Sequence, residues 1–179
     1  LEFRMKNIPL LRSLLLIFQL VTFIQSSYGQ TAKSYIDSGI VRSNRQDHHG
    51  AIEAYTKAIE LEPENPFSYS NRGLAKADLK NYNEAMKDYT KAIELDSCYF
   101  NAYILRGLSK AELLDYQGAI EDYSKAIECN PVSYMAYNNR ALIKHTLKDH
   151  HGALQDYTNT INYGPELPSV FSNRGNVKT

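Results

Sequence analysis

Paired histidines are the side chains with the clearest potential for chemistry in this 179-residue chain. Residues 47–51 and 149–153 both read Asp-His-His-Gly-Ala, so two imidazoles and a carboxylate occur together twice. A closed zinc site needs four converging ligands, and adjacent histidines at the start of a helix point in different directions. We therefore interpret the two segments as copies of one repeated sequence, and we expect no metal site and no cofactor.

Sequence signatures of catalysis are missing from the chain. It has no nucleophile elbow, no glycine-rich phosphate loop and no His-Glu-x-x-His segment. Its 20 basic and 20 acidic side chains give a formal net charge of zero. This balance disfavours a nucleic-acid partner, which requires a basic surface. Recurring carboxylates such as Glu53, Glu94 and Glu128 are typical of a solvated helix face. The sequence therefore predicts a protein that is not an enzyme.

The first 29 residues are typical of a targeting segment rather than of a folded domain. We interpret residues 1–4 as upstream translated or cloning-derived sequence. From Met5 a basic stretch precedes an apolar stretch at residues 14–24, and small residues follow at Ser27 and Gly29. This order of basic, apolar and small residues is that of a secretory signal peptide.

The predicted signal peptide covers residues 5–29, with cleavage before Gln30, and makes the mature chain an exported protein, either periplasmic or secreted. The rival interpretation is a membrane anchor, which needs about 20 apolar residues. Residues 14–24 are shorter than that and contain two polar side chains. After cleavage we expect no stable membrane span, whereas an uncleaved segment would tether the chain to the membrane.

The remainder of the chain, residues 30–179, repeats every 34 positions. Similar ten-residue segments begin at Ala51, Ala85, Ala119 and Ala153, each 34 residues after the one before. Self-similarity at this period predicts an array of stacked helical units. We divide the array into complete units at 32–65, 66–99, 100–133 and 134–167 and a partial unit at 168–179.

The recurring residue types are small, aromatic or proline. Position 8 of the units carries Gly39, Gly73, Gly107 and Ala141, and position 20 carries Ala51, Ala85, Ala119 and Ala153. Position 24 carries Tyr55, Tyr89, Tyr123 and Tyr157, and position 32 carries Pro63, Pro131 and Pro165, with Ser97 the exception. Over residues 32–179 the pattern resembles the tetratricopeptide repeat (TPR) family.

The resemblance implies an all-α fold, a right-handed superhelical solenoid of helix-turn-helix units. In each unit, small residues would let helices A and B approach closely, and tyrosine rings would fill the space between helices. We expect the tyrosine hydroxyls to reach water or a backbone carbonyl. Asp47, Asn81, Asp115 and Asp149 precede the B helices and are predicted to cap them.

Cys98 and Cys129 fall at positions 33 and 30 of successive units. A disulfide requires Cα atoms within about 7 Å, and an offset of nearly a whole repeat argues against that approach. We therefore predict no bridge between them. Cys129 replaces a leucine of other units and is expected to be a small buried hydrophobe. Intermolecular pairing of Cys98 stays open.

In TPR proteins the A helices line an inner, concave groove, so the resemblance implies a candidate peptide-binding face. Its residues would be asparagines at position 6, leucines at position 9 and large apolar residues at position 2. These are Asn71, Asn139 and Asn173, then Leu74, Leu108 and Leu142, then Phe67 and Met135. An asparagine amide can both donate to and accept from an extended backbone. The alternative is that these asparagines cap or bridge neighbouring A helices.

The carboxylate clamp of chaperone-binding TPR proteins is not matched. Of its five positions in the first three units only Asn71 fits, and the others carry Ile36, Ile40, Asn101 and Leu105. A chaperone C-terminus is therefore not the expected ligand. The sequence predicts a non-catalytic scaffold for a protein or peptide partner.

Two alternatives remain open for the region as a whole. It could be the accessory or sensor part of a larger, truncated enzyme or signalling protein. Because the partial unit leaves Phe171 and Val177 without the B helix they would pack against, self-association through this open end is also possible.

Overall fold

The computed structural model describes residues 31–165 and 168–177, which are entirely helical apart from short connections. The predicted signal peptide and residues 1–4 lie outside this range. The helices are α3 (Ala32–Asn44), α4 (His48–Leu61), α5 (Pro66–Asp78), α6 (Tyr82–Leu95), α7 (Phe100–Glu112), α8 (Tyr116–Cys129), α9 (Tyr134–Thr146), α10 (His150–Tyr163) and α11 (Pro168–Val177).

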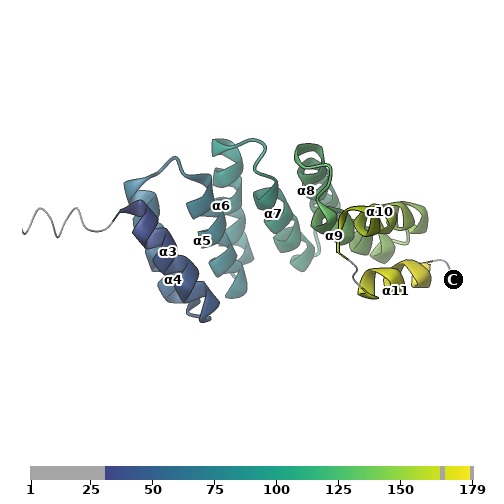
Figure 1. The fold of residues 1–179 in the computed structure, drawn as a ribbon, viewed down its shortest axis with the longest axis horizontal. Coiled ribbons are helices and arrows are strands. Elements are labelled where there is room, and N and C mark those ends of the chain that lie inside the picture. Colours follow the sequence, from purple (N-terminus) through teal and green to yellow (C-terminus); the bar gives the residue numbers. More distant parts are fainter. Residues whose placement is uncertain (1–30, 166–167, 178–179) are drawn as a thin grey trace, which may run out of the picture.

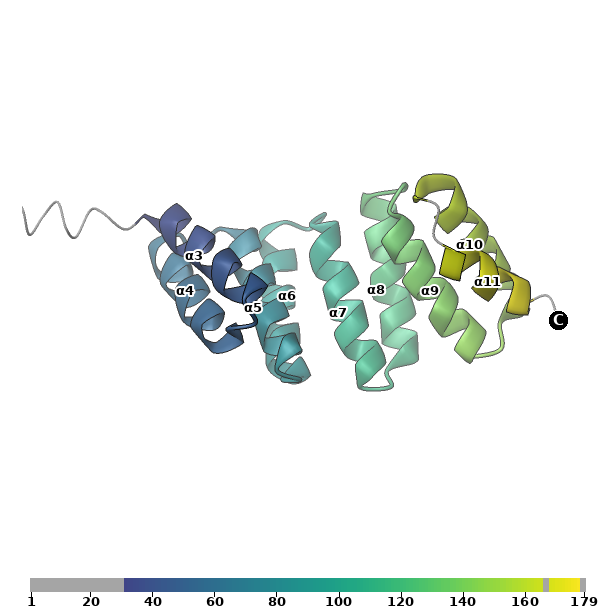
Figure 2. The same ribbon diagram turned by 60° about the horizontal axis from the view of Figure 1, so that its bottom comes forward.

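Successive helices pack as antiparallel hairpins, α3 with α4 through α9 with α10, and each hairpin stacks on the next (Figure 1). Figure 2 shows α3, α5, α7, α9 and α11 following one another along one face of the stack. The predicted all-α architecture of stacked helix-turn-helix units is thus confirmed. None of the helices in the described ranges is long and apolar enough to cross a membrane.

A close approach of the two helices in each hairpin depends on the small residue at position 8. Ala119 and Tyr123 of α8 are fully buried. A Cβ atom added at Gly107 of α7 would come within 2.7 Å of the Tyr123 ring, which is closer than real Cβ contacts. Gly39 and Gly73 make the same approach to Tyr55 and Tyr89, at 2.6 Å. The small residues therefore set the distance between the helices, as the sequence predicts.

The expectation for the tyrosine hydroxyls is wrong in part. The hydroxyl oxygens of Tyr123 and Tyr157 are buried and have no hydrogen-bond partner among the described residues. Burial, reinforced by the nearby Asp122 and Glu112 carboxylates, raises the pKa of Tyr123, so its phenol stays neutral. The burial of the ring outweighs the unmet hydrogen bond of one weakly polar group.

Replacing Gly107 with valine is expected to lower the free energy of unfolding by about 2 kcal/mol, because the branched side chain would push α7 away from the Tyr123 ring. Urea denaturation followed by circular dichroism measures the change. Gly175→Val is the matched control, because a Cβ at Gly175 of α11 meets nothing within 4 Å. Equal effects of the two substitutions would contradict the close-approach argument.

Helix caps and left-handed turns define the tip of each hairpin. As predicted, Asp47, Asp115 and Asp149 accept a hydrogen bond from the backbone N–H three residues on, at 2.9–3.0 Å, whereas Asn81 makes no side-chain cap. The residue before each cap is a non-glycine with φ of 62–64°, namely Gln46, Lys80, Leu114 and Lys148. This conformation reverses the chain after the A helix without a glycine.

Buried ion pairs tie the hairpins together in a way that the sequence analysis missed. Arg106 of α7 donates from Nε and Nη2 to both carboxylate oxygens of Asp122 on α8, at 2.9 and 2.7 Å, and Lys110 Nζ lies 2.9 Å from the same carboxylate. Arg106 Nη1 also donates to Thr90 Oγ1 of the preceding α6, at 3.0 Å. One arginine thus connects two successive B helices.

The same arrangement recurs in the hairpins on either side. The acidic partner is 5% exposed or less in all three. The equivalent sets are Arg72, Lys76, Asp88 and Thr56, and then Arg140, Lys144, Asp156 and Ser124.

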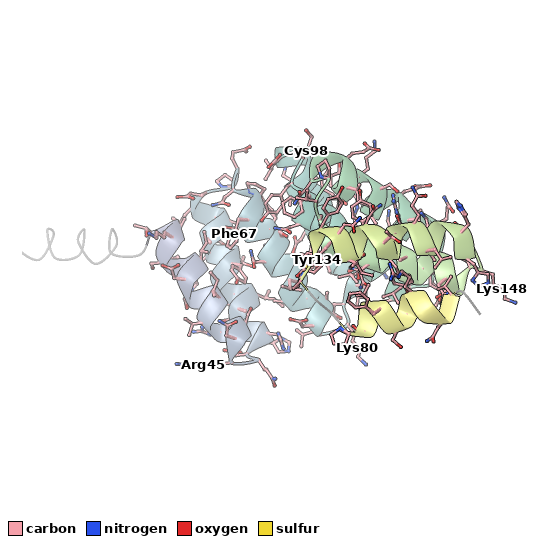
Figure 3. The ribbon with its side chains drawn as sticks, turned by 45° about the vertical axis from the view of Figure 1, so that its right-hand side comes forward. Arg45, Phe67, Lys80, Cys98, Tyr134 and Lys148 are labelled. Atoms are coloured by element: carbon pink, nitrogen blue, oxygen red, sulfur yellow. A yellow bond between two sulfur atoms is a disulfide. The ribbon has the colours of Figure 1, made fainter. Side chains whose placement is uncertain are left out.

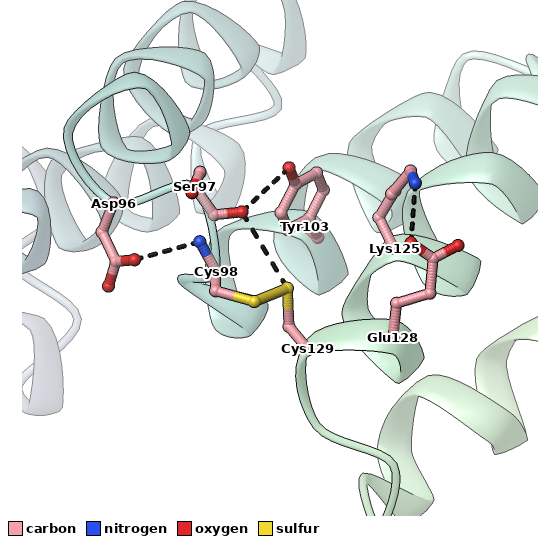
Figure 4. Close-up of a disulfide and its surroundings, with 7 residues drawn as sticks. All are labelled: Asp96, Ser97, Cys98, Tyr103, Lys125, Glu128 and Cys129. Atoms are coloured by element: carbon pink, nitrogen blue, oxygen red, sulfur yellow. Dashed lines mark hydrogen bonds and ion pairs between the residues drawn. A yellow bond between two sulfur atoms is a disulfide. The ribbon is translucent and has the colours of Figure 1, made fainter.

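A disulfide joins Cys98 and Cys129, so the prediction of no bridge is wrong (Figure 4). Their Cα atoms are 5.2 Å apart. The error lies in treating an offset of one repeat as a large distance, because stacking places equivalent ends of neighbouring hairpins side by side. Cys129 is also not fully buried. Around the bridge, Tyr103 Oη donates to the carbonyl of Ser97, and the Cys98 N–H donates to Asp96 Oδ1 at 3.0 Å.

Candidate functional site

A groove of about 360 Å³ crosses the face formed by α5, α7 and α9, and we call it the A-face groove. Phe67 of α5 and Tyr134 at the start of α9, both labelled in Figure 3, are two of its lining residues. The full lining consists of Phe67, Ser70, Asn71, Tyr99, Asn101, Ile104, Leu105, Leu108, Tyr134, Met135, Asn138 and Asn139.

The lining contains no Lys, Arg, Asp, Glu or His side chain. It combines amides and tyrosines with apolar side chains that are unusually open to solvent for their size. Phe67, Leu108 and Met135 are 39%, 40% and 45% exposed. Exposed apolar side chains beside amides are typical of a surface that binds another polypeptide.

The structure brings together some of the residues predicted for the peptide-binding face. Asn71, Asn139, Phe67, Leu108 and Met135 line the A-face groove. The remaining three candidates do not line it; these are Leu74, Leu142 and Asn173. Leu74 and Leu142 are still 38% and 40% exposed, on α5 and α9.

Two amides in the groove have hydrogen-bonding capacity that the described residues do not use. Asn71 Nδ2 donates to the carbonyl of Phe67, one turn earlier in the same helix, at 2.8 Å. This bond orients the side chain within α5 and leaves Asn71 Oδ1 as an acceptor. Asn138 Oδ1 is buried and has no donor among the described residues. Asn138 Oδ1 is therefore an acceptor that the described residues leave unused.

Sequence reasoning missed Asn138 and two tyrosines of the groove. Tyr99 lies in the connection before α7, and Tyr134 is the first residue of α9, so neither occupies a position that the repeat pattern assigns to the binding face. Desolvation by burial, with the nearby Asp96 carboxylate, raises the pKa of Tyr99. The hydroxyl of Tyr99 also makes a hydrogen bond with the Ser70 side chain of α5. The sequence signal that could have identified Tyr99 and Tyr134 is that each is an aromatic residue at the junction of two successive units.

Two of the paired histidines, His48 and His150, contact a neighbouring helix. His48 Nδ1 lies 3.2 Å from Asp78 Oδ2 of α5, and the rings of His145 and His150 lie 5.5 Å apart at the tip of the α9–α10 hairpin. Among residues 31–165 and 168–177, no group of three or more His, Cys, Asp or Glu side chains could hold a metal ion.

Models of protein families match the helical part of the chain. Two models described as tetratricopeptide repeat match residues 66–97 and 104–160, and a third, described as TPR repeat, matches residues 44–80. No curated protein matches the chain. A crystal structure of the MamA protein is 28% identical, with a TM-score of 0.72, over 83% of this chain and 81% of that chain.

Two domains solved with peptides are also similar. The first TPR of Spaghetti (RPAP3), bound to the HSP90 peptide SRMEEVD, is 30% identical over 66% of this chain and 94% of that chain, with a TM-score of 0.63. The second TPR domain of human RPAP3, in complex with the HSP70 peptide SGPTIEEVD, is 31% identical over 63% of this chain and 94% of that chain, with a TM-score of 0.61.

Together the family models cover residues 44–97 and 104–160, which contain most of the groove lining. TPR domains of this kind are generally non-catalytic modules, and the two RPAP3 domains bind peptides. The sequence pattern of small residues and tyrosines agrees with the stacked hairpins and with the matched models. This chain belongs to the tetratricopeptide repeat family.

Proposed function

We propose that the chain is a non-catalytic scaffold that binds an extended segment of a protein partner in the A-face groove. The observation that carries this proposal is the groove itself, in which the amides of Asn71 and Asn139 lie among the exposed side chains of Phe67, Leu108 and Met135. Amides recognise a peptide backbone, and exposed apolar side chains gain free energy when they are covered. The peptide complexes of the RPAP3 domains support the same use of the fold.

Leu108→Asp is expected to weaken peptide binding at least about tenfold, because it places a charge at the centre of the groove where a bound segment would have to desolvate it. The probes are peptides selected from a random display library on the immobilised protein, and fluorescence polarisation measures their affinity.

Leu114→Asp is the matched control for this test. Leu114 is 71% exposed at the tip of the α7–α8 hairpin and does not line the groove. Its substitution should leave the affinity unchanged. Equal affinities of Leu108→Asp and the parent protein would assign the binding face to another part of the solenoid.

We propose further that the chain acts outside the cytoplasm. The order of basic, apolar and small residues in 5–29 supports export. The disulfide between Cys98 and Cys129 supports it as well, because such bridges persist mainly in oxidising compartments. N-terminal sequencing of the exported protein is expected to begin at Gln30. A mature chain that still begins at Met5 would contradict the cleavage.

A further inference from the structure

We propose that the A-face groove accepts an internal, uncharged stretch of polypeptide and discriminates against a peptide that presents its terminal carboxylate there. This inference rests on the proposed function and specifies the chemical class of the ligand. The recognised segment is extended, carries apolar side chains, and continues beyond the groove at both ends.

The first argument concerns the cations that a terminal carboxylate would need. Helices α5, α7 and α9 contain six Lys and Arg side chains, two in each helix. All six are paired with the buried carboxylates of Asp88, Asp122 and Asp156 on the B helices, at 2.7–3.0 Å. These six cations therefore lie on the side of each helix opposite to the groove, where they are already paired. A carboxylate in the groove would lose water and gain no positive partner.

The second argument concerns the unused hydrogen-bonding groups. Asn138 Oδ1 and Asn71 Oδ1 are acceptors that the described residues leave without a donor, and N–H groups of a ligand would suit them. The amide nitrogen of Asn139 can donate to its carbonyls. An extended backbone presents N–H and C=O groups in alternation and meets both needs without any charged atom.

The experiment compares two random peptide libraries of the same length, about ten residues, which suffices for an extended chain to cross the groove. One library is displayed between flanking linkers, and the other ends in a free carboxylate. Selected peptides are then synthesised both as the acid and as the C-terminal amide. We expect enrichment from the flanked library, acid and amide affinities equal within about twofold, and less than about threefold loss between low and high salt.

Two substitutions test the amide acceptors directly. Asn138→Leu is expected to weaken the selected peptides about tenfold or more, and Asn71→Leu is a second variant in case the first perturbs the fold. Asn83→Leu is the matched control, because Asn83 is exposed on α6 and does not line the groove. Helix content measured by circular dichroism verifies that each variant is folded.

The outcomes separate the inference from the proposed function. Enrichment only from the free-carboxylate library, or an affinity at least about tenfold lower for the amide than for the acid, would overturn the inference and leave the proposed function standing. Enrichment of acidic sequences from the flanked library, or unchanged binding by both leucine variants, would also overturn it. Failure of both libraries to yield a binder would overturn the proposed function together with the inference.

Discussion

Replacing Asp122 with alanine is expected to lower the free energy of unfolding by about 3 kcal/mol. The Asp122 side chain is 4% exposed and receives Arg106 and Lys110, whose own side chains are 19% and 22% exposed. Removal of the carboxylate leaves two largely desolvated cations next to each other with no anion between them. This penalty for unpaired charge, rather than the net strength of the ion pair, accounts for most of the loss.

Urea denaturation measures the loss for Asp122→Ala, and two matched variants show its origin. Glu121→Ala removes the neighbouring carboxylate of α8, which is exposed, and should change stability by less than about 0.5 kcal/mol. Arg106→Met and Lys110→Met together with Asp122→Leu replace all three charged groups by apolar ones and should recover much of the stability. A loss in Asp122→Ala no larger than that in Glu121→Ala would contradict the role assigned to the buried carboxylate.

The bond from Arg106 to Thr90 makes this network a connection between hairpins as well as within one. We therefore expect Asp122→Ala to loosen the packing of α6 against α7. The first hairpin has no equivalent network, because positions 7 and 23 of its unit carry Ser38 and Ala54. The ion pairs thus stabilise the middle of the array, where the A-face groove lies.

The fold could be predicted from the sequence because one physical constraint recurs in every unit. Gly73 and Gly107 leave just enough room for Tyr89 and Tyr123, and such a contact has few alternatives in a helical hairpin. The ion pairs carry an equally periodic signal, since Arg72 and Asp88, 16 residues apart, are repeated 34 residues later. They were missed because acidic residues in a repeat were assumed to face solvent.

The candidate site could be predicted only in part. The repeat period fixes which side of each A helix faces the inner surface, and it therefore predicts Asn71, Asn139 and Met135 as groove residues. It does not predict Asn138 and Tyr99. Their access to the groove depends on how far neighbouring hairpins are rotated and on the path of the connection before α7. These are properties of helix packing in three dimensions, and a sequence period does not contain them.

Removal of the disulfide is expected to lower the free energy of unfolding by about 3 kcal/mol. Cys98 and Cys129 are separated by 31 residues, so their bond closes a long loop and restricts the unfolded chain. In the folded chain it holds the connection before α7 against the end of α8, and Tyr99 of the groove is the residue next to Cys98. Figure 3 shows Cys98 at the edge of the stack opposite to Lys80, at the tip of the α5–α6 hairpin.

The measurement compares urea denaturation of the parent protein, with and without dithiothreitol, to that of the double variant Cys98→Ser, Cys129→Ser. Reduction should lower the parent's midpoint to that of the double variant, whereas the double variant should not respond to the reductant. Because the restriction acts mainly on the unfolded chain, helix content before denaturation should be the same in all four samples. Two freely alkylated thiols in the untreated parent, or identical midpoints with and without reductant, would contradict a bridge that stabilises the stack.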